Sequence, residues 1–272
     1  MTRTTLRRLA TVGAFVAAAE LTMDGQGNAD WPLHNRDLHN SRYAPHDQIN
    51  TSNVDRLAVD WTFEMPAGGS IASTTPLVID GVMYFNAGST LHAVDAATGQ
   101  MRWSVTTEPA FRGGGRGPVY GDGRIYAFGS SIIYAVDATT GLPVDSFGNG
   151  GRLSITSEAL AFKYPDTYPP DVNPESLGYF MRTPPAYFDG VLYVGTLYSE
   201  NLIRGGLLIA ADGTTGAIRW VFNTVPQGPT DDGWELAKDT WGSGARLGGD
   251  LDAAGDRSRT RTPVCERVEP GD

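Results

Sequence analysis

Short apolar runs with an alternating pattern recur along this chain and predict β-strands. Three of these runs are interrupted by an Asp-Gly pair: PLVIDGVMYFNAG (76–88), PVYGDGRIYAFG (118–129) and PPAYFDGVLYVG (184–195). Asp-Gly between alternating apolar residues is a strong short-range signal for a two-residue hairpin. The pattern therefore predicts three β-hairpins of the same design.

A second recurring stretch follows each predicted hairpin. Its copies are AVDAATGQMRW (93–103), AVDATTGLPVD (135–145) and AADGTTGAIRW (210–220), which share A-x-D-x-x-T-G. The Asp side chain can accept hydrogen bonds from the backbone N–H groups just ahead of it, and Gly allows the positive φ that turns the chain back. We therefore expect a tight turn at each copy.

The spacing of the copies indicates the architecture. Trp61 to Trp103 is 42 residues, Trp103 to Asp145 is again 42, and Asp145 to Trp220 is 75, one further period plus 33 inserted residues. A period of about 40–45 residues with roughly four short strands is typical of a β-propeller blade. The sequence predicts an all-β propeller of four-stranded antiparallel blades, about four of them here, with Trp103 and Trp220 buried between blades. We expect Trp61 on the last strand of a blade whose other strands come from elsewhere. An antiparallel sandwich with chance similarity between the copies is the alternative.

The first residues resemble an export signal. Residues 2–8 contain three arginines and no acid, and residues 9–19 are almost wholly apolar but too short to span a bilayer. We expect residues 1–24 to be a signal peptide, residues 25–249 to be the propeller, and the mature protein to be periplasmic or secreted without a membrane span. A mitochondrial presequence or a buried helix is the alternative.

Composition narrows the choice of partners. Apolar residues make up 40% of the 272, and 34 glycines suit a globular, turn-rich protein. The net charge of −10 excludes nucleic acid and anionic membranes as expected partners.

The single cysteine, Cys265, permits no internal disulfide. Residues 250–272 hold ten charged residues among 23 and no aromatic, which predicts a disordered or aberrant tail outside the fold.

Taken as a set, these motifs resemble the quinoprotein dehydrogenases that use pyrroloquinoline quinone (PQQ). In that family A-x-D-x-x-T-G-x-x-x-W is the tryptophan-docking signature of an eight-bladed propeller. The opening stretch DWPLHNRDLHNSRYAPHDQINTSNVDRLAVDWTF (30–63) is also similar to the family's N-terminal segment. Further similar stretches are RGPVYGDGRIYAF (116–128), GLPVDSFGNGG (141–151) and RGGLLIAADGTTGAIRWVFNTVP (204–226).

The resemblance implies an exported oxidoreductase that binds PQQ and Ca²⁺. Such an enzyme oxidises a small alcohol or sugar and passes electrons to an acceptor such as cytochrome c or ubiquinone. The cofactor carries out the oxidation, while the protein supplies orientation, a Lewis acid and a base.

Three residues fall at positions that the family uses around the cofactor. Arg116, in GGGRGPVYGDG, takes the place of an arginine that anchors a PQQ carboxylate, for which a guanidinium fork is suited. Glu200, in GTLYSENLIRGG, takes the place of a glutamate ligand of Ca²⁺, a cation that prefers oxygen ligands. Phe111 stands, with Ala110, where many alcohol-oxidising members have adjacent cysteines, and it can cover one face of the quinone. The alternatives are a surface arginine, a solvated loop glutamate and a structural aromatic.

Other positions depart from the family pattern. Ser73 replaces a frequent glutamate, and Leu247 stands where the tryptophan beneath the cofactor is expected. The family's second Ca²⁺ ligand and its catalytic aspartate belong to later blades that nothing here supplies. We therefore expect the N-terminal part of a dehydrogenase, inactive as this fragment. The alternative is a non-catalytic exported propeller that serves as a scaffold for protein interaction.

Two further features of the sequence do not point to one specific function. His34, His39 and His46 match no standard zinc spacing. The proline-rich residues 163–175 lie within the 33-residue insertion and either shape substrate entry or form a plain solvated loop.

Overall fold

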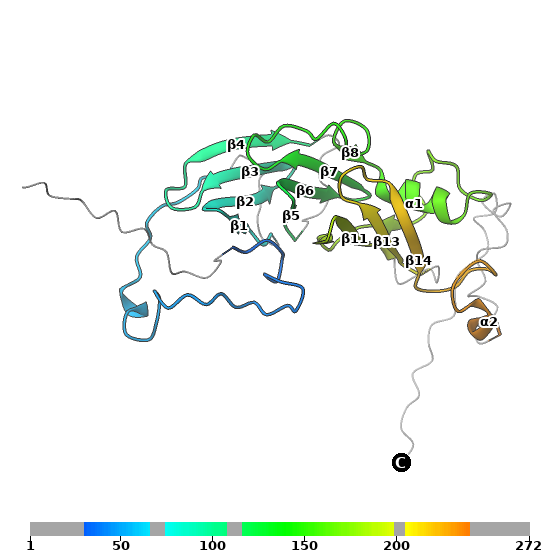
Figure 1. Ribbon diagram of the computed structural model, residues 1–272, viewed down its shortest axis with the longest axis horizontal. Helices are drawn as coiled ribbons and strands as arrows, with labels where there is room; N and C mark the ends of the chain where they lie inside the picture. Colours follow the sequence, from blue (N-terminus) through cyan, green and yellow to red (C-terminus); the bar gives the residue numbers. More distant parts are fainter. Residues whose placement is uncertain (1–29, 66–73, 108–115, 199–204, 240–272) are drawn as a thin grey trace, which may run out of the picture.

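The computed structural model describes residues 30–65, 74–107, 116–198 and 205–239. Within these ranges it contains three four-stranded antiparallel sheets, which follow one another along the molecule in Figure 1. The first sheet consists of β1 (Leu77–Ile79), β2 (Val82–Ala87), β3 (Thr90–Asp95) and β4 (Met101–Thr106). The second consists of β5 (Val119–Gly121), β6 (Arg124–Gly129), β7 (Ile132–Asp137) and β8 (Arg152–Leu153). The third consists of β10 (Ala186–Phe188), β11 (Val191–Gly195), β13 (Leu207–Asp212) and β14 (Ile218–Asn223).

The remaining elements lie between and beside these sheets. A short 3-10 helix, η1 (Val54–Arg56), lies in the N-terminal segment, and α1 (Ile155–Lys163) follows β8. The two-residue strands β9 (Tyr179–Phe180) and β12 (Leu197–Tyr198) pair with each other, and α2 (Trp234–Ala237) follows the third sheet. None of the helices among the described residues is long and apolar enough to cross a membrane.

Each sheet begins with the predicted Asp-Gly hairpin. In the first sheet Ile79 pairs with Val82, so Asp80 and Gly81 form the whole turn. Both residues have a positive φ, 46° and 72°, as a type I′ turn requires. The turns Asp122–Gly123 and Asp189–Gly190 repeat these values closely. The predicted hairpins are therefore confirmed.

The turn between the last two strands of the first sheet shows why its motif recurs. Asp95 Oδ1 accepts the N–H groups of Ala97 at 3.2 Å and Thr98 at 3.0 Å, and Gly99 has a φ of 70°. These bonds stabilise the turn locally, without help from the rest of the fold. The same contacts recur around Asp137 and Asp212.

A tryptophan joins the first sheet to the second. Trp103 Nε1 donates a hydrogen bond to the Ala138 carbonyl at 3.0 Å, and the Tyr84 hydroxyl donates to the same oxygen at 3.1 Å. The indole covers Gly141, where a Cβ would lie only 2.7 Å from ring atoms Cδ2 and Cε3. Trp103 is half-buried and lies between the sheets as predicted.

Trp61 makes the equivalent contacts with the first copy of the Asp-turn motif. Its Nε1 donates to the Ala96 carbonyl at 3.2 Å, and its ring covers Gly99. The residues around it, 57–65, form no strand in the structure, contrary to the expectation of a last blade strand. The reason is that no described strand lies beside them to complete a ladder.

The second and third sheets are joined differently. Tyr126 and Arg124 both donate to the Gly213 carbonyl, at 2.7 and 2.8 Å, and Leu153 takes the place of the indole against Gly216. The indole is missing at this junction because the second copy of the motif ends in Asp145 rather than tryptophan.

Trp220 contradicts the expectation that it is buried. It is 42% exposed and packs against Tyr193, with ring centroids 6.2 Å apart, as Trp103 packs against Tyr84 at 5.8 Å. Among the described residues no further copy of the Asp-turn motif lies against this pair. The sequence predicted about four blades, and the described part of the chain contains three four-stranded sheets.

The inserted residues contain a helix that the strand pattern did not predict. Helix α1 buries Ile155, Ala159 and Leu160 in the core that joins the second and third sheets. A smaller core, around Leu77 and Ile125, joins the first and second sheets. The insertion therefore adds to the packing between sheets.

Candidate functional site

The loops that enter the first strands of neighbouring sheets lie close together at one cavity. The Thr75 N–H donates to the Arg116 carbonyl at 2.8 Å, which ties the entry loop of the first sheet to that of the second. Gly117 has a φ of 115°, and a Cβ there would lie 2.2 Å from the Thr75 carbonyl oxygen. The close approach therefore requires glycine directly after Arg116.

Arg116 opens onto a cavity of about 390 Å³. The residue is exposed, and its guanidinium makes no hydrogen bond or ion pair with any described residue. The cavity is also lined by Thr183 from the entry loop of the third sheet and by His34, Asn35 and Arg42 from the N-terminal segment. The predicted anchor thus lines a space large enough for a ligand, and its donors make no bond within the described part of the chain.

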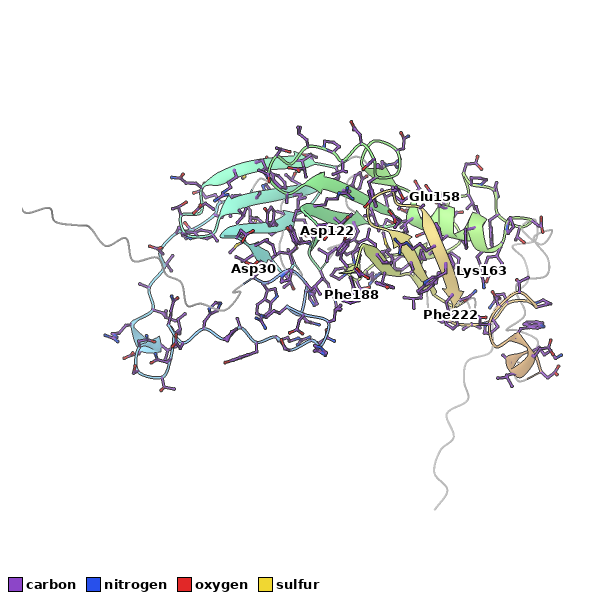
Figure 2. All side chains as sticks on the ribbon, in the orientation of Figure 1. Asp30, Asp122, Glu158, Lys163, Phe188 and Phe222 are labelled. Carbon is purple, nitrogen blue, oxygen red and sulfur yellow. The ribbon has the colours of Figure 1, made fainter. Side chains whose placement is uncertain are left out.

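The N-terminal segment reaches this cavity along the first strands of two sheets. Trp31 and Val78 exchange backbone hydrogen bonds of 2.7 and 3.3 Å at the edge of the first sheet. The Tyr120 N–H of the second sheet donates to the Pro32 carbonyl at 3.2 Å. Figure 2 shows the start of the segment, Asp30, beside the first sheet. Trp31 and Pro32 therefore hold the N-terminal segment to both sheets through their backbone groups.

The charges around the cavity favour an anion. Arg42 donates through Nε to Asn35 Oδ1 at 2.8 Å and keeps its remaining donors, and His34 has a buried Nδ1 with no partner among the described residues. Asp37, the acid in the lining, stays ionised because hydrogen bonds from Ser41 lower the pKa of its carboxyl, and it lies 3.8 Å from the Arg36 guanidinium. Arg42 and Arg116 leave the lining with an excess of positive charge. A carboxylated ligand such as PQQ fits this donor set.

The other two predicted site residues lie outside the described residues. Phe111 belongs to 108–115 and Glu200 to 199–204. Ser73, Leu247, the predicted signal peptide (1–24) and the predicted tail (250–272) likewise lie outside. Within the described residues, His34, His39 and His46 included, no group of three His, Cys, Asp or Glu is close enough to hold a metal ion.

The residues that flank the Glu200 segment are firmly held. The Thr196 N–H donates to the Leu207 carbonyl at 2.9 Å, and Leu207 N–H returns a bond of 2.9 Å to Thr196 Oγ1. Gly205 packs against Asn223, so that a Cβ would lie 2.6 Å from Asn223 Oδ1. Both ends of the segment are therefore fixed on the third sheet.

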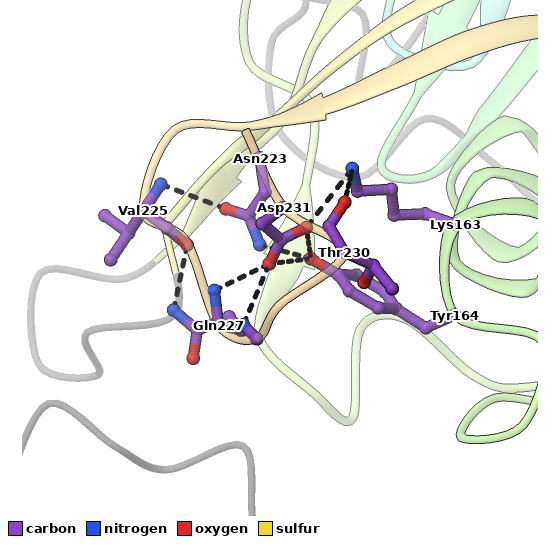
Figure 3. Close-up of polar contacts among 8 residues, drawn as sticks. Lys163, Tyr164, Asn223, Val225, Gln227, Thr230 and Asp231 are labelled. Atoms are coloured by element: carbon purple, nitrogen blue, oxygen red, sulfur yellow. Dashed lines mark hydrogen bonds and ion pairs between the residues drawn. The ribbon is translucent and has the colours of Figure 1, made fainter. Parts of the chain in front are cut away.

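Asn223 leads to a buried polar network that the sequence analysis missed (Figure 3). Its Nδ2 donates to the Tyr164 hydroxyl at 2.8 Å, and Tyr164 donates to both Asp231 carboxylate oxygens at 2.9 and 3.0 Å. Lys163 Nζ lies 3.2 Å from Asp231 Oδ1. Burial raises the pKa of Tyr164 above its ordinary range, so the hydroxyl remains a donor. The only signal in the sequence was the proline-rich insertion, 163–175, which starts with two of these residues.

The repeated sheets, the Asp-turn motif and the docked tryptophans define this chain as a β-propeller protein. The family model for the PQQ glucose/ethanol/alcohol dehydrogenase β-propeller domain matches residues 31–247. The chain belongs to this family of quinoprotein dehydrogenases.

Individual relatives agree with this assignment. The dehydrogenase subunit of the quinone alcohol dehydrogenase of Gluconacetobacter polyoxogenes is 33% identical over 246 residues, covering 82% of this chain and 32% of that protein. The quinohemoprotein alcohol dehydrogenase of Comamonas testosteroni is 30% identical over 258 residues, covering 84% and 32%. A solved quinohemoprotein alcohol dehydrogenase of Pseudomonas putida superposes with a TM-score of 0.62 at 25% identity, over 78% of this chain and 30% of that one. The chain thus spans about a third of the length of these relatives.

Proposed function

We propose that these residues form the N-terminal blades of an exported, periplasmic dehydrogenase that uses PQQ to oxidise alcohols or sugars. The observation that carries the proposal is the guanidinium of Arg116, free of partners among the described residues and held at its cavity by the Thr75 backbone bond. Bound PQQ supplies the two-electron oxidation, and the substrate's electrons pass on to cytochrome c or ubiquinone. Substrate and acceptor belong to the proposal, since the chain spans about a third of its relatives.

The role of this chain's own residues is to bind and orient the cofactor. Arg116 pairs with one carboxylate of PQQ, while Arg42 and the imidazole of His34 add further donors on the same anionic group. The close approach of Gly117 to the Thr75 carbonyl and the Thr75–Arg116 backbone bond fix the backbone from which the Arg116 side chain extends.

Two further assignments extend the proposal to residues that the structure does not describe. We assign Glu200 as a Ca²⁺ ligand and Phe111 as a cover for one quinone face, on the family resemblance alone. Glu200→Gln should weaken Tb³⁺ binding, followed by its luminescence, with the substitution Glu175→Gln, at an exposed glutamate of the proline-rich insertion, as the control. Equal Tb³⁺ affinity in both variants would remove the Glu200 assignment.

The proposal is tested by PQQ binding to the purified 272-residue chain. Arg116→Ala should weaken binding by about 10- to 100-fold, because a hydrogen bond to a charged group contributes about 1.5–3 kcal/mol. Arg152→Ala is the matched control, since Arg152 is an exposed arginine on β8 outside the cavity. Equal affinity of the two variants contradicts cofactor anchoring and favours the scaffold alternative.

Catalysis is tested separately from binding. With excess PQQ and Ca²⁺, the chain alone should reduce no redox dye in the presence of ethanol or glucose, since our assignment gives its residues a role in binding the cofactor but includes no catalytic base. Dye reduction that disappears in Glu200→Ala would show that these blades suffice for turnover.

A further inference from the structure

A second cavity, of about 210 Å³, lies at the end of the third sheet. It is enclosed by the loop after α1, by β9 and by the segment that follows β14, and it shares no lining residue with the Arg116 cavity. The rings of Tyr164, Tyr168 and Tyr179 line it. The cavity is therefore a separate space with an aromatic wall.

The buried network of Figure 3 holds one side of this cavity rigid. The Asp231 side chain is fully buried and accepts the Gln227 N–H at 2.6 Å as well as the Tyr164 hydroxyl. The ion pair with Lys163 at 3.2 Å joins the same carboxylate to the end of α1. Because several elements meet on one carboxylate, the cavity wall is preorganised rather than formed on binding.

The lining of the cavity carries no net charge. All its side chains are tyrosine, threonine, asparagine or glutamine, with one glycine. The two charged groups behind the wall, Lys163 and Asp231, neutralise each other. Among the described residues, a phosphate or carboxylate would find no free cation at this cavity and an ammonium ion would find no free carboxylate, so each would lose hydration without compensation.

Several polar groups at the cavity remain free for a ligand. Asn223 uses its Nδ2 for Tyr164 and its Oδ1 for the Val225 N–H. By contrast, the hydroxyls of Thr167, Tyr168 and Thr230 make no hydrogen bond to any described residue, and neither does Gln227 Oε1. These groups offer both donors and acceptors at neutral charge.

We propose that this cavity binds a neutral, hydroxyl-rich ligand of the size of a polyol or a single sugar ring. The C–H faces of such a ligand pack on the tyrosine rings, and its hydroxyls bond to the free threonine and glutamine groups. Apolar walls with a few placed polar groups are the usual form of a small-molecule site. The inference is independent of the cofactor site around Arg116.

The test is a titration of the full 272-residue chain with glucose and glycerol, followed by calorimetry and saturation-transfer NMR. We expect glucose to bind with a millimolar dissociation constant. Tyr168→Ala should weaken binding at least tenfold by removing an aromatic wall, and Thr230→Val should weaken it about 3- to 10-fold by removing one neutral hydrogen bond. Thr139→Val, a substitution at an exposed threonine in the turn after β7, is the matched control and should leave binding unchanged.

Each outcome decides for or against the site. Loss of binding in Tyr168→Ala or in Thr230→Val, with the control intact and the melting temperatures close to wild type, supports it. Should Tyr168→Ala unfold, the nearly isosteric Thr230→Val carries the test alone. The proposal is overturned if neither glucose nor glycerol binds, if both variants bind as wild type, or if acetate, inorganic phosphate or PQQ displaces the sugar.

Discussion

A methyl group at Gly141 would occupy the space of the Trp103 ring. Its carbon would lie 2.7 Å from Cδ2 and Cε3 of the indole, well inside the usual carbon–carbon contact of about 3.5–4.0 Å. The change Gly141→Ala therefore has to displace the indole from the second blade. Displacement also breaks the 3.0 Å hydrogen bond from Trp103 Nε1 to the Ala138 carbonyl.

The loss of stability in Gly141→Ala is the sum of two separate costs. Gly141 has a φ of 73°, and the left-handed backbone costs a residue with a Cβ about 1–2 kcal/mol. Overpacking against the indole adds about 1–3 kcal/mol. We expect Gly141→Ala to lower the free energy of unfolding by about 2–5 kcal/mol.

The chain contains a matched control for the backbone cost alone. Gly123 has a φ of 76°, and no atom lies within 4 Å of a Cβ built there. Gly123→Ala should therefore cost only about 1–2 kcal/mol. The difference between the two substitutions measures the contact between Gly141 and Trp103.

The assay is urea unfolding followed by far-UV circular dichroism, which is not altered by the removal of a tryptophan fluorophore. Free energies come from linear extrapolation of the transitions. In a Trp103→Ala background, Gly141→Ala should cost no more than Gly123→Ala. Equal losses for the two glycine substitutions in the wild-type background, or an excess loss at Gly141 that persists without Trp103, refute the docking assignment.

Three further predictions concern the tryptophans and two titrating groups. Trp103→Ala should lower the free energy of unfolding by about 2–4 kcal/mol and the 42% exposed Trp220→Ala by less than about 1 kcal/mol, and similar urea midpoints would contradict this. Burial lowers the pKa of His92, so the unfolded chain takes up a proton first and stability should fall as the pH drops below about 6.5. His92→Phe should reduce that fall in pH-dependent melts, and an unchanged slope would disprove the link. The Arg219 guanidinium and the turn N–H groups lower the pKa of Asp212 to about 2, so its stabilisation is present above the unfolded value of about 3.9 and is lost as the pH falls toward 2. Asp212→Asn should flatten the acid limb of the stability curve, and an identical limb in the variant would refute this assignment.

The candidate site shows how far sequence reasoning reaches. Arg116 could be proposed from the sequence because its position in a family motif is a local property, and in the structure it lines a cavity without a side-chain partner among the described residues. Its neighbours His34 and Arg42 come from 82 and 74 residues earlier in the chain, and no local pattern brings them to the same cavity. Tyr164 and Asp231 were missed for the same reason, because their contact joins segments 67 residues apart.

The sequence by itself determined the turns and the repeat. Asp80–Gly81 and the Asp95 turn are closed by hydrogen bonds and backbone angles within a few residues, so the residue types suffice to specify them. Only the tertiary structure decided which aromatic side chains are covered. Trp103 and Trp220 end the same repeated motif, yet Trp103 lies against the next blade and Trp220 is 42% exposed. Burial depends on whether another segment packs against the side chain, and such long-range packing leaves no trace in the surrounding eleven residues.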